Sequence, residues 1–367
     1  MPGNGTGSVD GMLTFDPMIE GQRAALLLAN GEVYVSWASY CDNGNYHGWL
    51  MSFDKETLAP HDVFVDTPNG YEGGFWASGS GPAADRQGVI FVPTGNGDFA
   101  PDSGDYGDSI LKLDVPCNLP RFGRLCRRGP LTLVDYFTPW DQHTLDMNDV
   151  DVASGGVMLL PDQPGTRYPH LLVQVGKEGT IDVVNRDNMG HWHSGDDSQI
   201  VQTLPYAIGG MWGSPANWNN YVYFAGVNDY LKGYAFDPET QLLSASPSTQ
   251  SPAQFFAPAP MLSVSSNGVQ NGILWALESD GVNQGYAILH AFLATDLTTE
   301  LYNSEQNPSR DRAGQSVKFA VPTVAEGHVF AGGKNQVAMY GLLTARQHQP
   351  GSEPRTQPSQ DHGRSVK

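Results

Sequence analysis

The chain has 367 residues and a formal net charge of −19, from 39 acidic and 20 basic side chains. This balance excludes nucleic acid and anionic membrane surfaces as partners, because binding to either depends on clustered lysine and arginine. A hydrophobic content of 40%, with 43 glycines and 26 prolines, indicates a turn-rich globular chain, and no apolar stretch is long enough for membrane insertion as a helix.

Six copies of one sequence repeat follow one another along the chain. Each copy has a small residue, often with a proline, then an apolar strand, a turn, an aromatic-rich strand and a strand that ends near aromatic-x-Asp, as in residues 213–237. The copies start near residues 26, 81, 155, 213, 259 and 321. This spacing is typical of propeller blades with loop insertions, and period-2 apolar runs such as residues 89–92 indicate β-strands.

The sequence therefore predicts an all-β fold over residues 1–343, a β-propeller of about six visible blades that are each a four-stranded antiparallel sheet. Residues 320–343 supply only two or three strands, so residues 9–15 would complete that blade in a closed ring. The alternative is a fragment of a larger propeller, which residues 1–25 favour because they are typical of the end of a preceding blade. Residues 344–367 are polar without apolar periodicity, which predicts a disordered tail.

Loops that lead into the innermost strand of a blade line the central channel of a propeller. Two such loops are near copies with a Gly-Gly-x-Trp pattern that ends at Trp76 and Trp212. We expect Gly74 and Gly210 to allow positive φ and close backbone approach, and the tryptophans that follow are suited to an aromatic wall for a planar ligand or a sugar. The favoured alternative is that both rings plug the channel or pack between blades.

Aspartates are the candidate metal ligands. One further channel loop carries two carboxylates, a Gly-bearing loop carries three, and oxygen ligands suit calcium. Neither loop matches the twelve-residue calcium loop with its terminal glutamate, so solvated turn aspartates are the favoured alternative. The calcium candidates are Asp149 and Asp151 in the first loop, and Asp102, Asp105 and Asp108 in the second.

Two basic residues complete the channel candidates. Lys177 is expected at a hairpin turn between two strands, and Arg186 in a loop that also contains His191 and His193. The two histidines stand two residues apart, which suits two metal ligands on one strand face. Since no third ligand is near in the sequence, surface histidines are the favoured interpretation.

Three cysteines leave an odd count. Cys117 and Cys126 bracket a short loop with Pro120 and Gly123, so a disulfide is expected there if the compartment is oxidising. Cys41 is then unpaired, and its favoured interpretation is a small buried hydrophobic residue.

The blade ends carry a family resemblance. Residues 289–296, with Leu301-Tyr302 after them, and degenerate copies at residues 52–57 and 234–240 resemble the repeat of bacterial pyrroloquinoline-quinone-like (quinoprotein-like) β-propeller proteins, in particular their uncharacterised secreted branch. The resemblance implies a propeller over roughly residues 9–343 and a periplasmic or secreted location. For a dehydrogenase of this family it also implies pyrroloquinoline quinone and calcium. The adjacent Cys-Cys pair of those enzymes is missing from this sequence.

The repeats are intact, but the Cys-Cys pair of the dehydrogenases is missing, and together these two observations favour a non-enzymatic function. We expect a secreted or periplasmic propeller that binds a small-molecule ligand or serves as a scaffold for a protein partner. The alternative is a pyrroloquinoline-quinone-dependent dehydrogenase of alcohols or sugars with calcium in the central channel. No Gly-x-Ser-x-Gly elbow, phosphate loop or dinucleotide fingerprint supports a hydrolase or a nucleotide-dependent enzyme.

Overall fold

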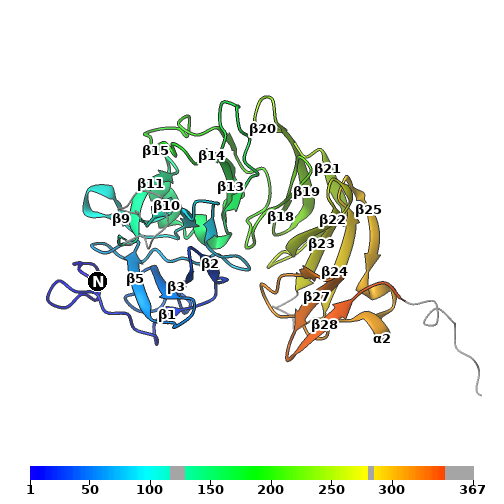
Figure 1. Cartoon of the computed structure of the whole chain (residues 1–367), viewed down its shortest axis with the longest axis horizontal. Coiled ribbons are helices and arrows are strands. Elements are labelled where there is room, and N and C mark those ends of the chain that lie inside the picture. The colour runs from blue at the N-terminus through cyan, green and yellow to red at the C-terminus, as the bar shows by residue number, and fades with distance from the viewer. Residues whose placement is uncertain (116–128, 280–284, 344–367) are drawn as a thin grey trace, which may run out of the picture.

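The computed structural model describes residues 1–115, 129–279 and 285–343. These residues form six sheets that follow one another in chain order around an arc, from blue to orange in Figure 1. The first meander strand of each sheet begins within a few residues of a predicted repeat start. The prediction of an all-β propeller is confirmed. Cys117, Cys126 and residues 344–367 lie outside the described residues.

Five sheets contain a meander of four antiparallel neighbours. The first sheet has β2 (Leu27–Ala29), β3 (Glu32–Ser39), β4 (Trp49–Asp54) and β5 (Pro60–Val65), and β1 (Glu20–Gly21) also pairs with β3. The second has β6 (Ala83–Ala84), β7 (Ile90–Pro93), β10 (Ile110–Asp114) and β11 (Thr132–Thr138). The third has β12 (Met158–Leu159), β13 (Leu171–Val175), β14 (Ile181–Asn185) and β16 (Gln202–Leu204).

The same pattern continues in the later sheets. The fourth has β17 (Ala216–Trp218), β18 (Tyr221–Ala225), β19 (Asp229–Asp237) and β21 (Thr249–Phe255), with β20 (Leu242–Leu243) also on β19. The fifth has β22 (Met261–Asn267), β23 (Gln270–Ser279), β24 (Ala287–Leu293) and β25 (Asp296–Asn303). The sixth has β26 (Thr323–Ala325), β27 (His328–Gly333) and β28 (Gln336–Tyr340).

Short elements occupy the connections. They are the hairpin of β8 (Phe99–Ala100) and β9 (Asp105–Tyr106), the strand β15 (His191–Trp192), the helices α1 (Gln142–Met147) and α2 (Pro308–Asp311), and the 3₁₀ turns η1 (Pro101–Ser103), η2 (Val152–Ser154) and η3 (Ser304–Gln306). In the described part of the chain, no helix is both long and apolar enough to cross a membrane.

The sixth sheet differs from the predicted four strands. Its described part has three, and residues 9–15 do not add a fourth. They lie instead against the first sheet, where the Phe15 ring meets the rings of Trp37 and Trp49 edge-on at centroid distances of 5.1 and 5.6 Å. The arrangement in which residues 9–15 complete the last blade is therefore wrong, because these aromatic contacts place Phe15 against the first sheet.

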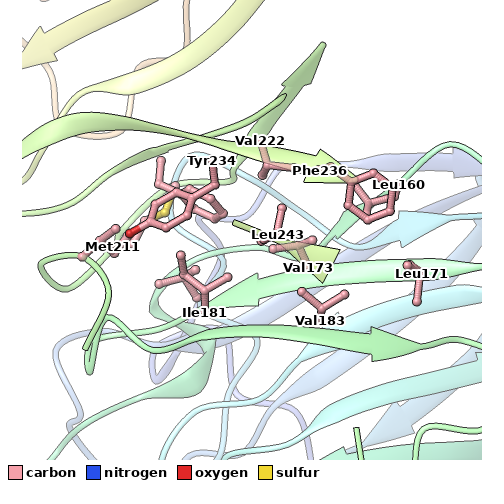
Figure 2. Packing of buried hydrophobic residues seen from close by; sticks show 13 residues of the cluster. Leu160, Leu171, Val173, Ile181, Val183, Met211, Val222, Tyr234, Phe236 and Leu243 are labelled. Atoms are coloured by element: carbon pink, nitrogen blue, oxygen red, sulfur yellow. The ribbon is translucent and has the colours of Figure 1, made fainter. Parts of the chain in front are cut away.

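The core lies between successive sheets rather than inside any one of them. Between the third and fourth sheets, Val173 and Ile181 face Val222 and Tyr234 (Figure 2), and all four are at most 1% exposed. Because the third sheet is covered on both faces by its neighbours, β13 is buried at every position. Stacking therefore holds the loops at one end of the sheets in fixed positions.

Candidate functional site

Three predicted channel loops meet in the structure and hydrogen-bond to one another. The amide of Ala77 donates to the carbonyl of Ala153 (2.9 Å), and the amide of Gly156 donates to the carbonyl of Gly213 (3.2 Å). The hydroxyl of Ser154 donates to the carbonyl of Met211 (2.7 Å). The loops that the sequence singled out in the second, third and fourth blades thus form one continuous rim. They are residues 73–78, 149–156 and 209–214.

A pocket of about 330 Å³ opens at this rim. Four predicted site residues line it, and residues from the first sheet complete the wall. We call it the tryptophan pocket and define it by Arg23, Asp42, Trp76, Asp151, Lys177 and Trp212. The structure therefore brings both predicted tryptophans together with the predicted lysine and one predicted aspartate.

Lys177 is the centre of charge in the tryptophan pocket. Its ammonium lies 2.6 Å from Asp149 Oδ1, 2.6 Å from Asp151 Oδ2 and 3.0 Å from the carbonyl of Asp149. Burial lowers the pKa of Lys177, but the two carboxylates outweigh burial and hold this pKa above its usual value. Lys177 thus stays charged near neutrality and is unsuited to act as a base. Its predicted position at the turn between β13 and β14 is confirmed.

Trp76 is only 8% exposed and lies beneath a cation. The Arg23 guanidinium is 4.9 Å from the centroid of the Trp76 ring and 5.2 Å from that of Phe319. Tyr46 meets Trp76 edge-on at 6.0 Å. Trp76 therefore both packs in the interior and contributes to the pocket wall, which combines the two interpretations that the sequence left open.

A second acidic group faces Lys177 and Asp151 from the first sheet. Asp42 accepts a hydrogen bond from the Tyr46 hydroxyl (3.1 Å). Burial, followed by the nearby charges of Asp151 and Asp149, raises the pKa of Asp42. Burial chiefly lowers the pKa of Arg23, although Asp151 opposes this effect.

The two pairs of glycines are required for different structural reasons. Gly73 and Gly74 have φ of +94° and +103°, as the sequence predicts. Gly209 and Gly210 are not among the positive-φ glycines, which corrects that expectation for the second loop. A Cβ on Gly210 would instead collide with the carbonyl oxygen of Lys177, so this position needs glycine for close backbone approach.

The calcium candidates do not converge. Asp149 and Asp151 hold Lys177, and Asp105 Oδ1 accepts backbone hydrogen bonds from Asn69 and Gly70 at 2.8 and 3.1 Å. The other two candidates are Asp102, which is exposed in η1, and Asp108, which is fully buried and accepts from the amide of Val152. No group of three His, Cys, Asp or Glu side chains in the described ranges is placed to hold a metal ion.

Arg186 lies away from the tryptophan pocket. Its guanidinium is 2.8 Å from Asp162 Oδ1 and 5.7 Å from the ring of Phe91, and the residue is 3% exposed. It therefore joins the second and third sheets. His191 and His193 are exposed and pair separately with Asp135 and Asp196, in agreement with the surface interpretation.

Sequence reasoning missed the contribution of residues 20–42. The sequence assigns Arg23 to the end of a preceding blade, and Asp42 lies in a connection of the first repeat that carries no recognisable motif. Cys41 was expected to be buried, but it is exposed at a φ of +59° and lies in the tryptophan pocket. That expectation is wrong because the turn after β3 projects to the surface.

The pocket does not fit pyrroloquinoline quinone. This quinone carries three carboxyl groups and requires an excess of cationic side chains. Arg23 and Lys177 are the two basic residues lining the tryptophan pocket, and Asp42 and Asp151 balance their charge. A trianion would have to compete with the carboxylates of Asp149 and Asp151, which already hold Lys177.

No protein-family model and no curated protein matches the chain. Among solved structures, it is similar to BamB from Moraxella catarrhalis, with 13% identity, a TM-score of 0.46 and coverage of 87% of this chain and 73% of that chain. It is also similar to a quinohemoprotein alcohol dehydrogenase from Pseudomonas putida, with 13% identity, a TM-score of 0.46 and coverage of 88% and 57%.

A quinohemoprotein alcohol dehydrogenase from Comamonas testosteroni shows 14% identity and a TM-score of 0.48, with coverage of 84% of this chain and 55% of that chain. This chain thus spans less than two thirds of either dehydrogenase. At these identities the likeness concerns the fold alone, so the function is argued from the residues of this chain.

Proposed function

We propose that this propeller is a binding protein, which takes a small polar ligand with a flat face into the tryptophan pocket and serves as a scaffold rather than as a redox enzyme. The observation that carries the proposal is the convergence of Trp76, Trp212, Arg23 and Lys177 on one pocket from separate sheets. Aromatic walls with a few placed polar groups are typical of small-molecule sites.

The charges of the pocket favour binding over proton transfer. Lys177 is held by two carboxylates and stays protonated, and Asp151 accepts the amide of Asn96 at 3.0 Å in addition to its contact with Lys177. Each charged group is thus fixed before a ligand arrives. A preorganised site of this kind orients a ligand at low entropic cost.

Saturation-transfer NMR with glucose as the sugar probe and nicotinate as the planar probe tests the proposal. We expect transfer to at least one probe, and its loss in Trp212→Leu. The matched control is Trp192→Leu, since Trp192 is exposed outside the pocket. Equal transfer to Trp212→Leu and to the unaltered chain, or no transfer to either probe, would contradict the proposal.

Reconstitution tests the alternative enzyme. The chain is mixed with calcium and pyrroloquinoline quinone, desalted, and assayed for quinone absorbance and for dye reduction with alcohols or sugars. We expect no retained quinone. Dye reduction that vanishes on replacement of Trp76 or Asp151 would overturn the scaffold proposal in favour of a dehydrogenase.

The family resemblance also supports a location outside the cytoplasm, which we include in the proposal. Fractionation of cells that express the natural gene measures it directly. Recovery of the protein in the cytoplasmic fraction alone would contradict it.

A further inference from the structure

A second pocket, of about 240 Å³, lies between α1 and the third sheet. We call it the acidic pocket and define it by Trp140, Asp141, Gln174, Glu178, Asp182 and Asp197. It shares Asp151 with the tryptophan pocket, so the two pockets are neighbours. Of the site residues that the sequence predicts, Asp151 alone lines this pocket.

The lining of the acidic pocket contains carboxyl groups but no Lys, Arg or His. Asp141 comes from the start of α1, Glu178 from the turn between β13 and β14, Asp182 from β14, and Asp197 from the connection to β16. Lys177 is the nearest cation along the chain, and it is held by Asp149 and Asp151. The four carboxyls therefore face one space without a cationic side chain among them.

Three donors around this pocket already serve its carboxyls. The Thr203 hydroxyl donates to Asp182 Oδ1 (3.0 Å), and the backbone amide of Trp140 donates to Asp197 Oδ1 (2.9 Å). The Thr180 hydroxyl donates to Glu178. A ligand in this pocket must consequently bring donors of its own.

Gln174 is an independent indication of a missing ligand. It lines the pocket and is 1% exposed, and its amide nitrogen donates to the carbonyl of Val152 (2.6 Å). Its Oε1 is buried without a hydrogen-bond partner. An unsatisfied buried acceptor costs free energy, and a donor group on a ligand would remove this cost.

The mouth of the pocket is aromatic. Trp140 is 47% exposed and Tyr206 is 73% exposed, and both line the opening. Aromatic faces attract organic cations and also cover an apolar chain. The described residues offer no three-carboxyl geometry for a metal ion, so the carboxyls suit a larger cation.

We propose that the acidic pocket binds a small organic cation, with its ammonium or guanidinium group among Asp141, Glu178, Asp182 and Asp197 and its apolar body against Trp140. This site is separate from the tryptophan pocket and does not rest on its function. Charge-assisted hydrogen bonds from the cation to the carboxylates and to Gln174 Oε1 supply the affinity.

The ionisation of the carboxyls agrees with this assignment. Burial raises the pKa of Asp182 to about 8, with further contributions from Asp197 and Glu178. Burial also raises the pKa of Asp197 to about 6, with Asp141 and Asp196 adding to the effect. Part of the cluster is thus protonated near neutrality, and a bound cation favours loss of these protons.

Titration calorimetry with phenethylamine and its neutral counterpart 2-phenylethanol tests the proposal. We expect phenethylamine to bind at least about tenfold more tightly, because only the amine brings a charge-assisted donor. The heat measured in two buffers of different ionisation enthalpy should show proton release near pH 6.5. Affinity should rise between about pH 5.5 and pH 8, as the carboxyls ionise while the amine stays protonated.

Two variants and a matched control locate the site. Asp197→Asn and Glu178→Gln keep their shapes and should each weaken phenethylamine binding about tenfold. Asp146→Asn alters a carboxyl on the same helix α1 that lines the neighbouring hollow with Trp192, and it should leave the affinity unchanged. Thermal unfolding of each variant establishes that it is folded.

Three outcomes would overturn the proposal. The first is equal affinity for the amine and the alcohol, and the second is equal weakening by Asp146→Asn. The third is displacement of phenethylamine by micromolar calcium chloride, which would assign the pocket to a metal ion instead.

Discussion

Lys177 is the residue on which the tryptophan pocket depends most. Its side chain is 21% exposed and that of Asp151 is 10% exposed, so replacement with methionine leaves a largely buried carboxylate without its cation. We expect Lys177→Met to lower the free energy of unfolding by about 2 kcal/mol, which is less than for a fully buried pair.

Urea unfolding of the variant measures this loss. Lys55→Met is the matched control, because Lys55 and its partner Glu56 have side chains that are 49% and 76% exposed. The control should change stability by less than about 0.5 kcal/mol. A Lys177→Met chain as stable as the control would show that Asp151 finds another partner.

Substitution of Gly74 tests whether backbone conformation alone requires glycine at this position, or whether close contacts with neighbouring atoms also require it. Its φ is +103°, and a Cβ there would lie 2.9 Å from Trp76 Nε1 and 3.0 Å from the Cβ of Ala38. Gly31 has a φ of +80° with no atom within 4 Å of such a Cβ. We expect Gly31→Ala to cost about 1 kcal/mol from strain, and Gly74→Ala to cost about 3 kcal/mol because contacts add to strain.

Thermal unfolding of both glycine variants provides the comparison. Equal losses of stability would mean that the neighbours of Gly74 give way, and that conformation alone accounts for this glycine. A larger loss in Gly74→Ala, together with a changed tryptophan fluorescence spectrum, would confirm that the loop fixes the Trp76 ring.

At the scale of elements, strands of neighbouring sheets stabilise one another. Ile181 in β14 is fully buried among side chains of the third and fourth sheets (Figure 2). We expect Ile181→Ala to lower the free energy of unfolding by about 3 kcal/mol while unfolding remains a single transition, because no sheet buries its faces alone.

Calorimetry and far-ultraviolet circular dichroism together check this prediction. Val269→Ala is the control, since Val269 is 69% exposed in the turn between β22 and β23 and should have no measurable effect. Two separate transitions in Ile181→Ala would show that the sheets unfold independently, contrary to the stacked arrangement.

The strand β15 shows what a local pattern leaves out at this scale. The two-residue spacing of His191 and His193 suits ligands on one strand face, although surface histidines are the interpretation that the sequence favours. In the structure β15 pairs in parallel with β11 of the second sheet, and His191 stacks on Tyr136 at a centroid distance of 4.4 Å. The segment therefore links two blades, which a strand's own sequence does not reveal.

At the scale of the whole molecule, buried carboxyls make stability depend on pH. Burial raises the pKa of Glu20 from 4.5 to about 8 and that of Asp182 from 3.8 to about 8. Between about pH 4 and pH 8 the folded chain therefore holds protons that the unfolded chain has lost. The stability that these groups contribute is full below their unfolded pKa values and is lost as pH rises through the folded values.

We expect the melting temperature to be higher near pH 5.5 than near pH 8, and lower pH also relieves the repulsion of the net charge of −19. Carboxyls with a lowered pKa, such as Asp54 and Asp237, lie at exposed turns and act only below about pH 4. Scanning calorimetry across this range measures the difference.

The variant Glu20→Gln isolates the contribution of Glu20 to the pH dependence of stability. The amide oxygen can still accept the Trp49 indole N–H that Glu20 Oε1 accepts at 3.0 Å, but the side chain no longer titrates. The difference in melting temperature between the two pH values should shrink, whereas Glu56→Gln at an exposed position should leave it unchanged. An unchanged difference in Glu20→Gln would mean that Glu20 titrates normally.

Most of the fold was predictable because its signals are local. Period-2 apolar runs and turn residues locate the six repeat starts, from residue 26 to residue 321. The two Gly-Gly-x-Trp loops indicate equivalent positions at one end of the blades. Trp76, Trp212, Asp151 and Lys177 were found in this way, since each lies in a loop that connects strands.

The sequence by itself determined the all-β class, the order of the blades and the loops that form the rim, because strand period and turn chemistry act over a few residues. Only the tertiary structure decided which side chains meet. Arg23 reaches the Trp76 ring, Arg186 lies between two sheets, and the carboxyls of the acidic pocket come from separate segments around residues 141, 178–182 and 197. Most of these contacts join residues far apart in the chain, and strand period and turn chemistry, which act over a few residues, do not specify them.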